Sequence, residues 1–135
     1  MSVAQKSFGT TKNGEEVTLY TITNKNNVSV SVIDYGANLV SLTVPDKNGK
    51  YANVILGHDS IDHVINSPEP FLSTTIGRYG NRIAKGKFTL FGEEHELTIN
   101  NGPNSLHGGP TGFHARVWDA VQIDESTVQF NSVSA

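Results

Sequence analysis

Apolar and polar residues alternate along much of the chain, in short runs that turn-forming residues separate. Residues 17–22 and 28–32 are two such runs, and Asn24-Lys25-Asn26-Asn27 lies between them. Side chains point alternately to the two faces of a β-strand, so this pattern predicts a β-hairpin with one buried face.

Three further pairs of runs have the same character and predict three further hairpins. They are residues 38–44 with 52–56, 87–91 with 94–99, and 116–123 with 127–133. The segments between them contain Pro, Gly, Asn, Asp and Ser, the residues that favour turns.

Only residues 60–66 have helical spacing. Ile61, Val64 and Ile65 would share one face, and Ser60 is a candidate N-cap. Many short strands with turn signals between them predict an all-β fold, an antiparallel β-sandwich. We expect residues 1–135 to form part of a single domain, because no repeat or linker interrupts the pattern.

Composition narrows the classes of partner and compartment. The net charge of −3 gives no reason to expect a nucleic acid or an anionic membrane as partner. The absence of cysteine excludes disulfides and thiolate metal sites. The first residues lack the apolar core of a signal peptide, and no apolar run approaches the length of a membrane span. We therefore expect a cytoplasmic protein.

One loop stands out for its chemistry. Residues 100–113, NNGPNSLHGGPTGF, contain four glycines and two prolines, which argue against a regular helix or strand. His107 is the sharpest polar group there, because histidine suits proton transfer near neutral pH, and the glycines beside it would let a ligand approach the backbone. The alternative is a Gly/Pro-rich turn with an incidental, solvated histidine.

A second candidate segment is residues 76–83, IGRYGNRI. Arginine offers a fixed fork of donors and asparagine offers a donor and an acceptor, which suits the hydroxyl groups of a sugar. The alternative is a turn whose arginines, Arg78 and Arg82, are solvated or pair with Glu93 or Glu94. Tyr79 is placed to stack on a sugar or to pack on its neighbours.

The two segments together resemble a known family. GRYGNRI and NSLHGGPTGF, followed by Trp118, strongly resemble the aldose 1-epimerases (galactose mutarotases), and residues 34–42 and 54–57 also fit that family's N-terminal pattern. The resemblance implies a large antiparallel β-sandwich, the galactose mutarotase-like supersandwich. It also implies interconversion of the α and β anomers of aldohexoses such as galactose and glucose, by acid–base ring opening and without a cofactor.

The resemblance also implies roles for particular residues. By motif, Asn81 and Arg82 correspond to the family's substrate-binding pair. His107 corresponds to its first active-site histidine, a catalytic and substrate-binding residue that hydrogen-bonds around the anomeric centre and the ring oxygen. The implied partner is a small-molecule aldohexose.

The chain also departs from the family's pattern. The second histidine and the base glutamate lie further along in such proteins, which are roughly two to three times this length. Beyond His114 the remaining acids are Asp119, Asp124 and Glu125, and none lies in a motif that would replace them. We expect the N-terminal part of one aldose 1-epimerase domain, weakly active or inactive until a complementary C-terminal segment supplies the missing groups. The alternatives are a non-catalytic carbohydrate-binding fragment and a product that cannot fold stably.

The other histidines give weaker signals. His58 and His63 are five residues apart, which does not place them on one helical face, and no metal site is expected. We expect His95 and His114 to be structural or solvated.

Overall fold

The computed structural model describes residues 1–134, and antiparallel β-strands dominate it, as predicted. The strands are β1 (Ser2–Thr10), β2 (Glu16–Thr23), β3 (Ser29–Ile33), β4 (Asn38–Pro45), β5 (Tyr51–Asn53), β6 (Arg82–Ile83), β7 (Lys87–Leu90), β8 (Glu93–Glu96), β9 (Ser105–Leu106), β10 (Asp119–Asp124) and β11 (Thr127–Asn131). One α-helix, α1 (Ile61–Ile65), and two 3₁₀ turns, η1 (Ala84–Gly86) and η2 (Phe113–Ala115), complete the described elements.

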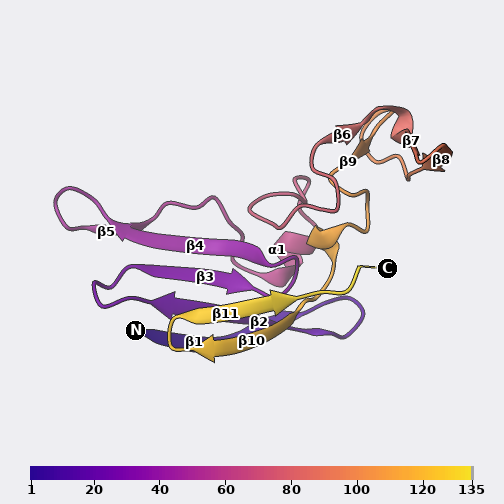
Figure 1. Cartoon of the computed structure of the whole chain (residues 1–135). Coiled ribbons are helices and arrows are strands. Elements are labelled where there is room, and N and C mark those ends of the chain that lie inside the picture. Colours follow the sequence, from indigo (N-terminus) through magenta and orange to yellow (C-terminus); the bar gives the residue numbers. More distant parts are fainter. Residues whose placement is uncertain (135) are drawn as a thin grey trace.

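The first five strands form an antiparallel meander in the order β1-β2-β3-β4-β5 (Figure 1). Strand β1 was not predicted from the sequence. It lies at the edge of the sheet, pairs only with β2, and exposes most of its residues. An edge strand with little buried surface does not need alternating apolar residues, so it lacks the pattern that identified β2 and β3.

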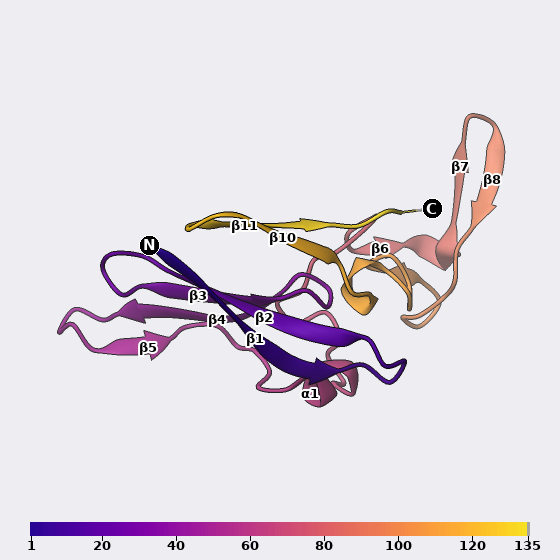
Figure 2. The ribbon, with the colours of Figure 1, turned by 90° about the horizontal axis from the view of Figure 1, so that it is seen from below.

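The two faces of this sheet are covered differently (Figure 2). On one face Val17, Leu19 and Ile33 form the core with Ile61 and Val64 of α1. On the other face lies the β10–β11 hairpin. It makes a second layer in which Phe130 meets Tyr20 edge to face, with ring centroids 5.7 Å apart. The second layer of the predicted sandwich is thus this single hairpin, among the residues described.

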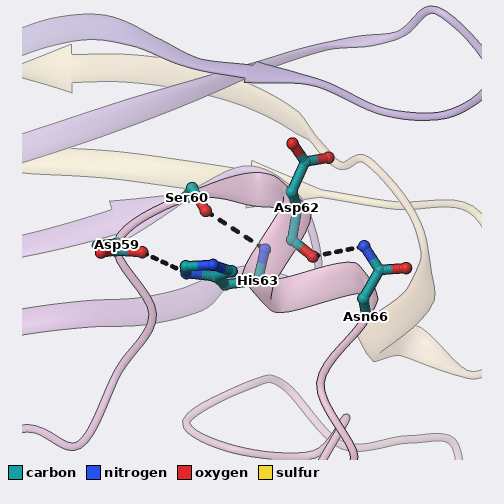
Figure 3. A network of polar contacts seen from close by, with 5 residues as sticks. All are labelled: Asp59, Ser60, Asp62, His63 and Asn66. Atoms are coloured by element: carbon teal, nitrogen blue, oxygen red, sulfur yellow. Dashed lines mark hydrogen bonds and ion pairs between the residues drawn. The ribbon is translucent and has the colours of Figure 1, made fainter.

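Helix α1 begins as its sequence predicted. The Ser60 hydroxyl accepts a hydrogen bond from the His63 backbone N–H, and the Asn66 side chain donates to the Asp62 carbonyl at the other end (Figure 3). Asp59 and His63 form an exposed pair, with 2.6 Å between the carboxylate and Nδ1. The helix is too short to be stable alone, so its position depends on burial of Ile61 and Val64. No helix among residues 1–134 has the length and apolar character needed to span a bilayer.

A third region extends away from the two layers. The β7–β8 hairpin projects from the body of the molecule, and β6 pairs with β9 at its base (Figures 1 and 2). Several predicted boundaries were too long: β5 ends at Asn53, β8 ends at Glu96, and β10 begins only at Asp119. Beyond β8, backbone bonds of Leu97 and Asn100 go to Gly86 and Asn104, which are not on a neighbouring strand.

The turn between β3 and β4 joins these regions. Gly36 donates its N–H to the Arg116 carbonyl, and its own carbonyl accepts from the Thr75 N–H and the Thr74 hydroxyl, each at 2.8–2.9 Å. The side chain of Asn38, which is buried, donates to the Leu72 carbonyl at 2.9 Å. One turn therefore fixes both the segment that leads to β6 and the segment that leads to β10.

Gly36 itself cannot carry a side chain here. Its φ is +67°, and a Cβ would lie 2.5 Å from both the His114 carbonyl oxygen and the Thr74 hydroxyl. Gly49 provides a comparison, because it has a similar φ of +79° but open space around the position of a Cβ.

We expect Gly36→Ala to lower the free energy of unfolding by about 2 kcal/mol more than Gly49→Ala. Both substitutions place an alanine in a left-handed backbone conformation, but only Gly36→Ala creates a steric clash. Urea unfolding followed by Trp118 fluorescence measures the difference. Equal losses in the two variants would show that this turn does not hold the segments together.

Candidate active site

His107 and Asn81 contact each other through two hydrogen bonds. The backbone N–H of His107 donates to the Asn81 carbonyl at 3.0 Å, and the backbone N–H of Asn81 donates to Nδ1 of the His107 ring at 2.9 Å. Both residues have left-handed backbone conformations, with φ of +54° and +65°. Such conformations are uncommon outside glycine and concentrate at functional sites.

This contact determines where the ring proton of His107 lies. A ring nitrogen that accepts a backbone N–H carries no proton, so in the neutral ring the proton is on Nε2. No group among residues 1–134 hydrogen-bonds to Nε2, and Nε2 is not one of the buried, unpartnered nitrogens. The half-buried His107 therefore presents a free N–H donor.

Arg82 lies on β6 beside this pair. Its Nε donates to the Asn101 side chain at 2.8 Å, and its Nη1 donates to the Asn81 side-chain oxygen at 3.1 Å. Arg82 makes no ion pair with Glu93 or Glu94 in the described part of the chain; its partners are asparagines, and Glu94 pairs with Lys87. Asn81 accepts with its oxygen, so its amide N–H₂ and the second guanidinium nitrogen of Arg82 remain as donors.

Strands β6 and β9 bring the two sequence motifs together. Arg82 pairs with Leu106 in this two-stranded ladder, which puts His107 directly after β9 and Asn81 directly before β6. The prediction that residues 100–113 contain no strand was wrong at this point. Ser105 and Leu106 lie between the glycines, and the Asn100 side chain holds the Leu106 backbone with bonds of 2.7 and 3.0 Å.

The glycine after His107 has a different role from the one predicted. A Cβ on Gly108 would lie 1.8 Å from the Gly77 carbonyl oxygen, and one on Gly112 would lie 2.9 Å from the same atom. The missing side chains thus allow close contact between the two motif loops. A ligand is not needed to explain them.

A cavity of about 720 Å³ lies next to the pair Asn81 and Arg82. Its lining includes those two residues, the exposed ring of Tyr79, and apolar side chains from β7 and η2, among them Phe88 and Phe113. His107 does not line this cavity. Asn81, which bonds to His107, and Gly108, which follows His107 in the sequence, both line the cavity.

Two residues near His107 were not identified as part of this region from the sequence. Phe71 contacts the rings of both His107 and His114, with centroids 4.8 and 4.6 Å apart. His114 is 7% exposed and its Nδ1 has no hydrogen-bond partner. Burial, and then the nearby His107 and Arg116, lower the pKa of His114 below its ordinary value. We expected His114 to be either structural or solvated, and its burial supports a structural role.

The remaining histidines lie elsewhere. His95 stacks on Phe88 with ring centroids 5.0 Å apart, and His63 pairs with Asp59 at the surface. Within residues 1–134 no group of three or more metal-ligating side chains is placed to hold a metal ion.

Stability should fall on mild acidification because of His114. Its folded pKa lies below 6.5, so the unfolded chain takes up the proton first, and the contribution present above about pH 6.5 is lost as the pH falls. Burial raises the pKa of Asp34, which gives the opposite sign at lower pH. Urea unfolding at about pH 7.5 and about pH 5.5 measures the change. The decrease should be smaller in His114→Gln, in which Asp34 is retained, and an unchanged decrease would exclude His114 as its source.

Comparison with known proteins supports the family resemblance along nearly the whole chain. The sequence model of the family Aldose 1-epimerase matches residues 18–135. Galactose mutarotase of the mouse (Mus musculus) is 37% identical over 134 residues, which are 99% of this chain and 39% of the mouse protein. Galactose mutarotase of cattle (Bos taurus) is 42% identical over 105 residues, which are 78% of this chain and 30% of the bovine protein.

Solved structures show the same fold. A crystal structure of an aldose epimerase homologue from C. elegans superposes with a TM-score of 0.77 at 34% identity, over 94% of this chain and 35% of that one. Galactose 1-epimerase from Lactobacillus acidophilus superposes with a TM-score of 0.73 at 28% identity. The chain therefore spans well under half the length of these relatives, and by its family match, its sequence identity and its fold it belongs to the aldose 1-epimerase family.

Proposed function

We propose that this chain carries part of an aldose 1-epimerase site, in which Asn81, Arg82 and His107 bind an aldohexose. The observation that carries the proposal is the bond from the Asn81 N–H to Nδ1 of His107, which leaves a free donor on Nε2, while the Asn81 side chain accepts a bond from Arg82. Relatives named galactose mutarotase and aldose 1-epimerase support this reaction and this class of substrate.

In this proposal His107 acts as a hydrogen-bond donor. Opening the sugar ring breaks the bond between C1 and the ring oxygen, and negative charge develops on that oxygen. A fixed N–H donor aimed at the oxygen stabilises this charge more than it stabilises the closed ring. In the neutral ring the bond at Nδ1 selects the tautomer with its proton on Nε2, because a proton on Nδ1 would remove the acceptor of the Asn81 N–H.

Asn81 and Arg82 orient the sugar. The second guanidinium nitrogen of Arg82 and the amide N–H₂ of Asn81 point donors at ligand oxygens, while Asn101 holds the guanidinium in place through Nε. Neutral hydroxyls accept such bonds without a charge on the ligand, as an aldohexose requires.

The acid and the base of the reaction come from elsewhere in this proposal. Residues 1–135 correspond to 39% of the mouse relative, and we infer that the groups are supplied by a segment equivalent to the later part of that protein. The cavity beside Arg82 and the exposed apolar residues around it suit such a segment. Tyr79 and Val133, which line the cavity, are 59% and 91% exposed.

The chain alone should give little acceleration of α-galactose mutarotation in polarimetry. Each missing general acid or base costs about 10²–10⁴-fold, so the rate should lie near the spontaneous one. Circular dichroism first establishes that the protein is folded. Acceleration that His107→Ala abolishes would show that residues 1–135 hold a complete site and that the inference about the missing groups is wrong.

A chimera tests His107 in a complete protein. Residues 1–134 of this chain replace the matching 39% of mouse galactose mutarotase, and kcat/KM for galactose is measured by a coupled assay. His107→Ala should lower kcat/KM by about 10²-fold or more, since it removes a donor that acts in the transition state. His95→Ala, a histidine on the projecting hairpin, is the matched control and should leave kcat/KM nearly unchanged. Equal activity in the two variants would contradict the role of His107.

A further inference from the structure

Phe71 lies between two histidine rings. The ring of His107 meets it at an interplanar angle of 64°, and the ring of His114 meets it at 61°, with both centroids within 5 Å. Phe71 is half-buried and belongs to the loop between α1 and β6, whereas both histidines follow β9. The contact therefore joins two segments that the sequence separates by more than 30 residues.

The His107 ring needs a constraint besides its polar contact. Only one ring atom, Nδ1, has a hydrogen-bond partner among residues 1–134. Rotation by half a turn about the Cβ–Cγ bond would put a carbon in the place of Nδ1 and would move Nε2 as well. A single hydrogen bond of this kind resists the rotation weakly, whereas an aromatic ring packed against the imidazole also limits it by contact.

Phe71 is itself held in place from the sheet. The carbonyl of the next residue, Leu72, accepts the buried Asn38 side chain at 2.9 Å, and the Ser73 carbonyl accepts the Leu39 N–H at 2.8 Å. The Phe71 ring also contacts His114, which is buried at the start of the segment that Gly36 fixes. The ring is thus supported by the five-stranded sheet, through backbone and through a buried side chain.

We propose that Phe71 is a positioning residue that fixes the ring orientation of His107, and with it the direction of the free Nε2–H donor. Its catalytic consequence rests on the proposed function, but the orientation itself does not. His114 packs against the other edge of this arrangement as a buried ring, and burial lowers its pKa, which disfavours a positive charge next to Phe71.

Nitrogen NMR of the histidine rings in the full chain tests the proposal at neutral pH. In the unaltered protein His107 should give two distinct ring nitrogens, an unprotonated Nδ1 and a protonated Nε2. Phe71→Leu should abolish this distinction and give averaged signals, because the ring then rotates and exchanges tautomers. Phe71→Tyr retains the aromatic ring and should restore two distinct signals.

Phe130→Leu is the matched control. Phe130 is also half-buried and also makes an edge-to-face contact, with Tyr20 on the other side of the molecule. It should destabilise the chain without changing the His107 nitrogen signals. Unchanged signals in folded Phe71→Leu, or the same averaging in Phe130→Leu, would overturn the proposal.

A measurement on the unaltered chain covers the case in which Phe71→Leu does not fold. Nuclear Overhauser contacts between the Phe71 and His107 ring protons should be present, together with those between Phe71 and His114. Absence of the first contact would overturn the proposal. None of these readouts depends on turnover, so a failed activity assay would contradict the proposed function and leave this result standing.

Discussion

The backbone of Gly36 bonds to Thr74 and Thr75 on one side and to Arg116 on the other, and these contacts position the functional part of the molecule. The five-stranded sheet supplies the rigid element, and the Gly36 turn connects it to both loops that carry the family motifs. The position tolerates only a residue without a side chain, because neighbouring atoms occupy the space. The absence of a side chain at Gly36 is thus required for the geometry of the candidate site, although other segments form that site.

The geometry of the candidate site depends on the short β6–β9 ladder and on the contact between the Asn81 backbone and the His107 ring. Strands β6 and β9 contribute two residues each, too few to be stable alone, and side chains of Asn100 and Asn101 reinforce them. The result is a histidine whose one ring nitrogen is occupied by a main-chain amide. The backbone contact selects which ring nitrogen of His107 accepts, and the packing of Phe71 against the ring adds a second constraint on its orientation.

Alternation of apolar and polar residues was enough to predict β2, β3 and β4, which contribute to the buried sheet, and helical spacing predicted α1, which buries Ile61 and Val64. Alternation flanked by turn residues also predicted the β7–β8 and β10–β11 hairpins, although the residues of β7 and β8 are almost all exposed. It could not predict β1, whose residues are mostly exposed, or β9, which is held by the Asn100 side chain within a glycine-rich loop. His107, Asn81 and Arg82 were proposed as site residues because they lie in the two motifs that resemble the family. Phe71 was not, since its contact with His107 depends on how Asn38 anchors a distant loop.

The close approach of Gly108 to the Gly77 carbonyl links the two motifs as a pair. The two glycine-containing loops pack directly against each other. A side chain therefore cannot be added to either loop at this point unless the other loop moves away. A mutational route that altered one loop alone would pass through a form in which Asn81 and His107 had separated. Substitutions in either loop are therefore best made at other positions, with the facing glycines kept because they set the distance between the loops.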